Sequence, residues 1–157
     1  MLQKIFNTKA LGTISTTAAL STSLLIAPTP VRADYRDFIN DVGEQLIRAG
    51  MASGLRGYEL THEPVINSMN HGYSSYVTVT LRAGVSYGIV GVCDRDCRDL
   101  DIALINDRGY AIASDMGNDD IPFIPITPSR TATYRIRVDM SRCHNQPCYY
   151  GVGIFGR

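Results

Sequence analysis

The sequence contains no tryptophan, no Gly-x-Ser-x-Gly segment and only three histidines. Hydrolysis of a glycosidic bond by paired carboxylates needs a cleft that binds sugar rings, and the lack of tryptophan removes the usual aromatic platform. Nucleophilic catalysis needs a base and an orienting acid beside the nucleophile. The histidines, His62, His71 and His144, instead stand singly in polar or turn-like stretches. The sequence therefore predicts a protein that is not an enzyme.

Lysine is absent after Lys9. Residues 34–157 contain 12 arginines and 15 acidic residues, which gives a net charge of 12 − 15 = −3. A mildly acidic chain offers no basic surface to nucleic acid or to anionic lipid. We therefore expect no nucleic-acid partner.

The chain also lacks a run of about 20 apolar residues, the length that crosses a membrane. A basic stretch with Lys4 and Lys9 is followed by an uncharged segment, residues 10–27, that is diluted by serine and threonine. Val31-Arg-Ala33 then places small or β-branched residues where a signal peptidase cuts. We expect residues 1–33 to be a cleaved secretory signal. The protein would be exported to the periplasm or the exterior, with no membrane anchor after cleavage.

Residues 34–157 have the length of one domain. Asp34 can cap a helix, and the apolar residues after it follow a helical spacing that ends near Ala49. Glycines at 50, 54 and 57 then predict a break. We expect a short N-terminal amphipathic helix and a Gly-rich linker over residues 34–57, followed by a β-sandwich domain over residues 58–157.

From residue 76 the apolar residues alternate in short stretches separated by turn residues, which is typical of strands. The stretches are residues 76–81, 87–92, 101–105, 110–113, 121–126, 133–138 and 149–155. Because Pro122 and Pro125 cannot complete a ladder of hydrogen bonds, residues 121–126 should form an edge strand. The pattern predicts an all-β fold, an antiparallel β-sandwich of about seven to eight strands.

Four segments of the β-rich part resemble, in order and spacing, the bacterial pre-peptidase C-terminal domain family. They are residues 81–89 (LRAGVSYGI), 99–109 (DLDIALINDRG), 134–138 (YRIRV) and 150–154 (YGVGI). The resemblance covers about residues 76–155. It implies a jelly-roll-like sandwich without a catalytic site, usually appended to a secreted peptidase, and some relatives bind calcium or extracellular matrix polymers. In contrast to that pattern, this sequence has no peptidase domain and carries paired cysteines.

All four cysteines lie in the β-rich part, at Cys93, Cys97, Cys143 and Cys148. An even number in an exported chain predicts two disulfides, with three connectivities open. We favour pairing within each close pair, although bridges between the two loops remain open. Three residues separate Cys93 from Cys97, which disfavours a redox site with its two-residue spacing. A four-thiolate zinc site competes poorly with disulfides in an oxidising compartment.

If every connection reverses the chain, the loops at residues 93–100, 114–120 and 139–148 all emerge at one end of the sandwich. The cysteines would then lie near a group of carboxylates. Carboxylates from several loops suit calcium, although the spacing is not that of an EF-hand, and the alternative is solvated carboxylates paired with arginines. The predicted calcium ligands are Asp94, Asp96, Asp99 and Asp119. We expect no other cofactor.

Taken together, the sequence predicts an exported, non-catalytic accessory or binding module of the bacterial envelope or exterior. Its partner would be a protein or an extracellular polymer, with Tyr73 and Tyr76 as contact residues, because aromatic side chains are enriched at interfaces. One alternative is a calcium-dependent adhesion or polymer-binding module. Another is an accessory factor of a secreted peptidase, or a hydrolase with a site at His62 or His71. The oligomeric state does not follow from the sequence.

Overall fold

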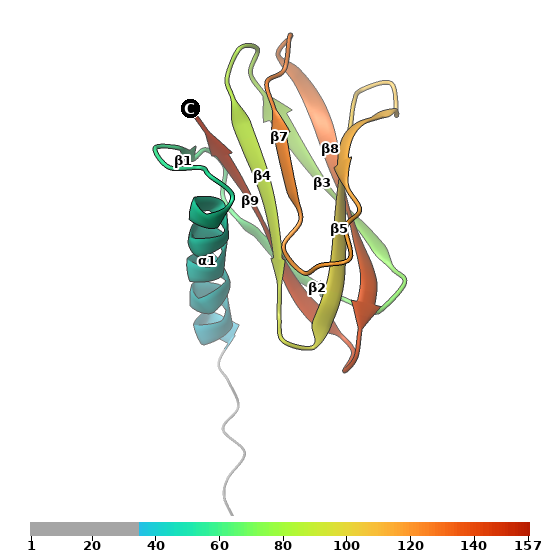
Figure 1. The fold of residues 1–157 in the computed structure, drawn as a ribbon. Helices are drawn as coiled ribbons and strands as arrows, with labels where there is room; N and C mark the ends of the chain where they lie inside the picture. The colour runs from blue at the N-terminus through green and yellow to red at the C-terminus, as the bar shows by residue number, and fades with distance from the viewer. Residues whose placement is uncertain (1–34) are drawn as a thin grey trace, which may run out of the picture. The chain divides into compact units, whose positions relative to one another are not determined.

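The computed structural model describes residues 35–157, with side chains from Val42 onward, so the predicted signal segment 1–33 lies outside the described residues. One helix precedes nine strands in this part of the chain (Figure 1). In chain order they are α1 (Tyr35–Ala52), β1 (Glu59–Leu60), β2 (Val65–Met69), β3 (Ser74–Leu81), β4 (Tyr87–Cys93), β5 (Cys97–Ile105), β6 (Ala111–Asp115), β7 (Phe123–Ile126), β8 (Ala132–Cys143) and β9 (Cys148–Gly156).

The strands form two antiparallel sheets. Sheet A has the order β1-β9-β4-β7, and β2 also pairs with β9; sheet B has the order β3-β8-β5-β6. The all-β antiparallel sandwich is therefore confirmed, and β7 lies at an edge as its prolines predict. Strands β1 and β2 raise the number of strands to nine. They escaped the sequence prediction because β1 has two residues and β2 is half-buried without clear alternation.

The main core lies between the two sheets. Tyr134, Ile136 and Val138 of β8 share one buried face, as their alternation predicts. In β9, Tyr150 is buried in this core whereas Tyr149 is exposed. These inward side chains pack with the apolar residues of β3, β4 and β5 into one continuous cluster.

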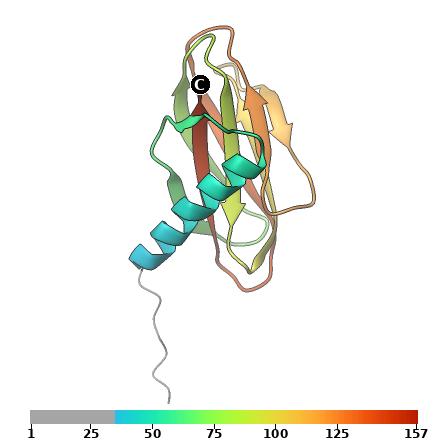
Figure 2. The same ribbon diagram turned by 60° about the vertical axis from the view of Figure 1, so that its left-hand side comes forward.

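Helix α1 packs on the outer face of sheet A, over β9 and β4 (Figure 2). Val42, Leu46 and Ala49 repeat at helical spacing and are buried against this face. Glycine in β9 makes the close approach feasible, because a Cβ atom at Gly151 would collide with Val42. Strand β4 is therefore buried on both faces.

The helix extends to Ala52, three residues beyond its predicted end. The reason is that Gly50 does not break the helix. A Cβ atom at this position would lie 3.3 Å from the ring of Phe155, so the glycine lets the helix approach β9. The segment predicted as a linker is also packed, since Leu55 is buried in the cluster beneath the helix.

The cysteine-bearing turns lie together at one end of the sandwich, as predicted. Cys97 of β5 and Cys143 of β8 are direct partners in the sheet B ladder. The loop after β6 reaches the same region, because Leu100 donates its N–H to the carbonyl of Asp119 at 3.0 Å. We call this the cysteine end, formed by the turns at residues 94–96, 116–122 and 144–147.

Candidate binding surface

Two disulfides join the sheets at the cysteine end. Cys93 is bonded to Cys97 and Cys143 to Cys148, which is the favoured local pairing. Since β4 and β9 belong to sheet A whereas β5 and β8 belong to sheet B, each disulfide links the two sheets. The Cα atoms of each bridge are 5.9 Å apart, less than the roughly 10 Å between packed sheets. The sheets therefore converge at this end.

Asp94 has a structural role in the turn between β4 and β5. Its Oδ1 accepts the N–H groups of Asp96 and Cys97, each at 3.2 Å, and its Oδ2 accepts the N–H of Tyr149 at 2.8 Å. Tyr149 lies in β9, so this carboxylate ties the turn to the neighbouring strand of sheet A. A carboxylate that accepts several backbone N–H groups stabilises a turn without any ion.

The other predicted calcium ligands make separate contacts. Asp96 accepts an amide hydrogen bond from Asn145 at 2.7 Å, and Asp119 accepts the N–H two residues further along its own loop. Asp99 is buried, and its Oδ2 lies 3.9 Å from Arg142. Within the part of the chain that the structure describes, no three His, Cys, Asp or Glu side chains are placed to hold a metal ion. Calcium binding at these residues therefore stays a prediction.

Thermal unfolding tests the calcium prediction. An ion that binds only the folded protein must raise Tm. If the prediction holds, about 1 mM calcium, the weak end of protein calcium sites, raises Tm, and the Asp119→Ala variant shows no such rise. Magnesium at the same concentration is the control for ionic strength. Equal Tm values with and without calcium would contradict calcium binding.

A second pair of acids lies on the outer face of sheet B. Asp101 of β5 and Asp139 of β8 stand opposite one another in the ladder. Ser141 donates to Asp101 Oδ2, while Ser74 and Arg137 donate to Asp139 at 2.5 and 2.8 Å. Asp101 Oδ1 is buried without a hydrogen-bond partner. Burial raises the pKa of Asp101, the Ser141 hydrogen bond opposes that rise, and neighbouring carboxylates add to it.

This pKa shift predicts how stability depends on pH. Because folding raises the pKa of Asp101 above its ordinary value of 3.8, the folded protein binds the proton more tightly than the unfolded chain. Stability therefore falls as pH rises from about 4 through the native pKa. Asp101→Asn should flatten this dependence and increase stability at pH 7 by about 1 kcal/mol or less, since the group is partly solvated. Urea unfolding between pH 4 and 7 measures it.

The control for this prediction is Asp107→Asn. A hydrogen bond from Arg130 lowers the pKa of the exposed Asp107 carboxyl. Neutralising Asp107 removes a favourable contact and should give no gain at pH 7. An equal gain in both variants would show that net charge, and not the setting of Asp101, controls the effect.

His62 is hydrogen-bonded, whereas His71 and His144 are exposed. His62 Nε2 lies 3.2 Å from the carbonyl of Thr80, and its Nδ1 lies 2.9 Å from Thr61 Oγ1. His71 and His144 are exposed at the cysteine end. Within residues 42–157 no histidine forms an ion pair with a carboxylate. His62 instead links the segment after β1 to the edge of sheet B.

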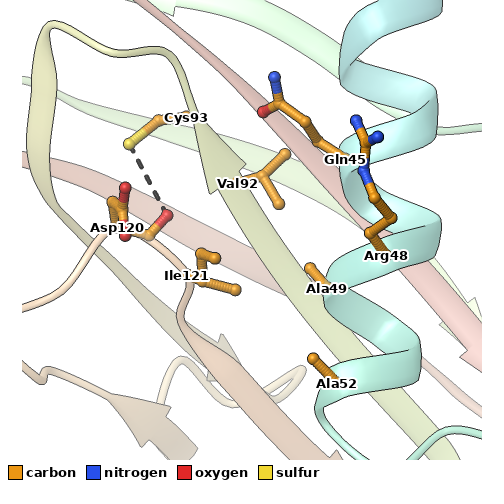
Figure 3. A pocket seen from close by; sticks show the side chains of 8 residues that line it. All are labelled: Gln45, Arg48, Ala49, Ala52, Val92, Cys93, Asp120 and Ile121. Atoms are coloured by element: carbon orange, nitrogen blue, oxygen red, sulfur yellow. Dashed lines mark hydrogen bonds between the residues drawn. The ribbon is translucent and has the colours of Figure 1, made fainter.

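An apolar groove runs between α1 and the loop that leads into β7 (Figure 3). It arises because the helix covers β9 and β4 but not β7, and it has a volume of about 380 Å³. Cys93 Sγ lies 3.7 Å from the Asp120 carbonyl, a packing contact because a disulfide sulfur has no proton. The groove has an apolar floor and few polar groups, so we assign it no ligand. Its lining residues are Gln45, Arg48, Ala49, Ala52, Val92, Cys93, Asp120 and Ile121.

Among residues 35–157, no helix lies over the outer face of sheet B, in contrast to that of sheet A (Figure 1). Tyr73 and Tyr76, the predicted contact residues, lie at its β3 side and are 66 % and 54 % exposed. Arg135 of β8 lies over the ring of Tyr76, 5.4 Å from its centroid. Exposed apolar side chains continue onto β6 and the loop after it. We call this surface the sheet B face and define it by Tyr73, Tyr76, Ile112, Met116, Arg135 and Arg137.

Sequence reasoning identified the two tyrosines of this face but missed the other members. Ile112 and Met116 were assigned to a strand and a polar loop, and their exposure depends on which face of β6 is buried. Leu104 and Ala113 are partners in the ladder and Ala113 packs toward the core, so Ile112 points outward. The alternation of β8 already placed Arg135 on the face opposite to its buried residues, and this signal was available.

No protein-family model matches the chain, and no curated protein matches it by sequence. Within the described residues, no helix has the length and apolar character of a membrane span. Several solved structures are similar to the fold, among them those of two proteins.

One is PliG of Aeromonas hydrophila, a periplasmic inhibitor of g-type lysozyme, with 11 % identity, 65 % of this chain and 90 % of that chain covered, and a TM-score of 0.47. The other is the pre-peptidase C-terminal domain of a collagenase from Bacillus anthracis, with 12 % identity, 58 % and 86 % covered, and a TM-score of 0.46. The second belongs to the family that residues 76–155 resemble in sequence.

Proposed function

We propose that this protein is an exported, non-catalytic binding module that docks a protein partner through the sheet B face. The observation that carries the proposal is the difference between the two sheets. On sheet A, α1 covers the outer face over β9 and β4, whereas the outer face of sheet B exposes aromatic, aliphatic and arginine side chains.

The chemistry of this face fits a protein partner. Tyrosine, methionine and arginine are enriched in the buried centres of protein interfaces. Tyr76 offers a flat apolar ring that Arg135 already supports from one side. Arg137 is held by Asp139 at 2.8 Å, so its orientation is fixed before a partner binds. A surface whose side chains are ordered in advance loses less entropy on binding.

Export is supported by two features of different kinds. The first residues carry the pattern of a secretory signal, and all four cysteines of the described residues form disulfides. Disulfides persist in oxidising compartments such as the periplasm and the exterior. The module would therefore meet its partner outside the cytoplasm.

The experiment isolates the partner and then measures its affinity. The tagged protein is used to capture proteins from the periplasm and culture medium of the bacterium that produces it, and the captured protein is purified. Calorimetry then compares the native protein with the Tyr73→Ala/Tyr76→Ala variant. We expect at least about a 30-fold loss of affinity, since one interface hot spot contributes about 2 kcal/mol or more.

The matched control is Tyr110→Ala. Tyr110 is 68 % exposed, so it is as accessible as Tyr73, but it lies in the turn between β5 and β6, at the end opposite to the cysteine end. This variant should bind with native affinity. Equal affinity of all three proteins would show that the interface lies outside the sheet B face and would contradict the proposal.

A further inference from the structure

Both sheets end in edge strands, and their edges differ in protection. An edge strand presents unpaired N–H and C=O groups to any other chain, and proteins usually block it with proline, bulges, short length or capping side chains. In the described part of the chain the edges are β7 and the β1–β2 side of sheet A, and β3 and β6 of sheet B. Three of these four edges carry such protection.

Each protected edge has its own device. Strand β7 contains Pro125, which has no N–H, and Asp115 accepts the N–H of Phe123 at 2.9 Å. On the β1–β2 side the strands are short and separated by Pro64, and the Asn67 side chain accepts the N–H of Ser68 at 2.8 Å. Strand β6 has five residues and pairs with β5 through a register shift. These edges are poor templates for another strand.

Strand β3 lacks these devices over residues 74–78, and within the described residues only His62 caps it, at the carbonyl of Thr80 near its end. It has eight residues, Ser74–Leu81, without proline, charge or glycine, and it pairs with β8 at eight consecutive positions without a register shift. Its alternating tyrosine, valine and threonine residues have high β-propensity. By the rule for edge strands, such a strand is expected to pair with another chain.

The free groups of β3 can be assigned to particular residues. In an antiparallel ladder, alternate residues direct both N–H and C=O to the same neighbour. The carbonyl of Thr80 points away from β8, because His62 lies 3.2 Å from it. Ser74, Tyr76 and Thr78 therefore also direct their backbone groups outward, and the described residues give these groups no partner. His62 occupies the acceptor at one end, so the open segment is centred on Tyr76.

We infer that the β3 edge pairs with the β3 edge of a second copy of this chain, antiparallel and about a two-fold axis at Tyr76. This register places Tyr76 opposite the same residue of the other copy and Ser74 opposite Thr78. Residues that direct their backbone groups outward then face one another across the interface, so each pair exchanges both of its hydrogen bonds. Two-fold pairing of one surface with itself is the commonest arrangement of protein oligomers.

Charge also favours a second copy as the occupant. Strand β3 has no charged residue, so pairing with a second β3 places no like charges opposite one another. The nearest arginine in the ladder, Arg137, is the β8 partner of Tyr76 and is paired with Asp139. In the dimer the two Arg137 positions would be three strand spacings apart, roughly 14 Å, beyond the screening length of about 8 Å. The two sheets B would become one continuous sheet.

The test is the oligomeric state of the protein and of variants at Thr78. Thr78→Pro removes an outward N–H and leaves the bonds to β8 in place, and Thr78→Lys adds a charge to the edge. We expect sedimentation velocity of the native protein, at concentrations up to about 1 mM, to show a dimer. The dissociation constant of the dimer should be at least about tenfold larger in both variants. The control, Thr133→Lys, places the same charge on the outer face of central strand β8 and should remain dimeric.

Amide hydrogen exchange provides a readout without any variant. In the dimer the Tyr76 and Thr78 amides should be protected to the same degree as those of Val77 and Val79, and this protection should decrease on dilution. A monomer over the whole concentration range would overturn the inference, as would a dimer that Thr78→Pro leaves intact. Protection that appears only when a different protein is added would assign the edge to that protein and equally overturn self-pairing.

Discussion

Replacing Gly151 with alanine is expected to destabilise the protein by about 3 kcal/mol, the upper end of the cost of overpacking a core. The added Cβ atom would lie only 2.3 Å from a methyl carbon of Val42, which packs from α1 onto β9. Valine in a helix has essentially one χ1 rotamer, so this methyl group cannot rotate away. The helix must therefore move off the sheet. Urea unfolding measures the loss of stability.

Two further variants identify the cause of that loss. Val42→Ala removes the colliding methyl group, so Gly151→Ala/Val42→Ala should cost less than the sum of the two single changes, with a coupling of about 1 kcal/mol or more. Gly43→Ala is the matched control, since no atom lies within 4 Å of its added Cβ. It should stabilise the helix by about 0.5–1 kcal/mol. Additive effects at 42 and 151 would show that helix packing is not the origin.

Much of the fold could be predicted because the relevant signals are local. Strand β8 alternates over Tyr134, Ile136 and Val138, and this pattern alone fixes its buried face. The clustering at the cysteine end followed from counting strands, because reversal at every turn sends alternate loops to one end. What stayed hidden was the role of the glycines in β4 and β9. The sequence marks glycine only as a flexible residue. The neighbouring side chains, from α1 for β9 and from Leu55 and Pro122 for β4, show that these glycines permit close packing.

The candidate surface was less predictable for a different reason. The acidic residues at the cysteine end were conspicuous in the sequence, but hydrogen bonding decides what each one does. Asp94 accepts three backbone N–H groups and stabilises a turn. Asp101, whose pKa is raised, is not among the residues that the sequence predicts as calcium ligands. The free edge of β3 depends on which strand lies beside it, and no pattern within residues 74–81 can supply that fact.

Removing the disulfides is expected to have the largest effect of all. Each bridge closes a short loop, so the chain-entropy argument gives about 2 kcal/mol for each pair. The structure adds a second contribution, because all four cysteines are buried in the core between the sheets. We therefore expect about 2–4 kcal/mol for Cys93→Ala/Cys97→Ala and for Cys143→Ala/Cys148→Ala. Single domains are stable by only about 5–15 kcal/mol, so the quadruple variant should lose most of its stability.

The two pairs should also depend on one another, since Cys97 and Cys143 are neighbours in the sheet B ladder. Either disulfide holds the sheets together at the same end. When one is removed, the other still limits their separation, so the quadruple variant should lose more stability than the sum of the two pairs. Urea unfolding of the four proteins measures this coupling. Strict additivity would show that each bridge stabilises only its own turn, and the two sheets would then be held at this end by core packing alone.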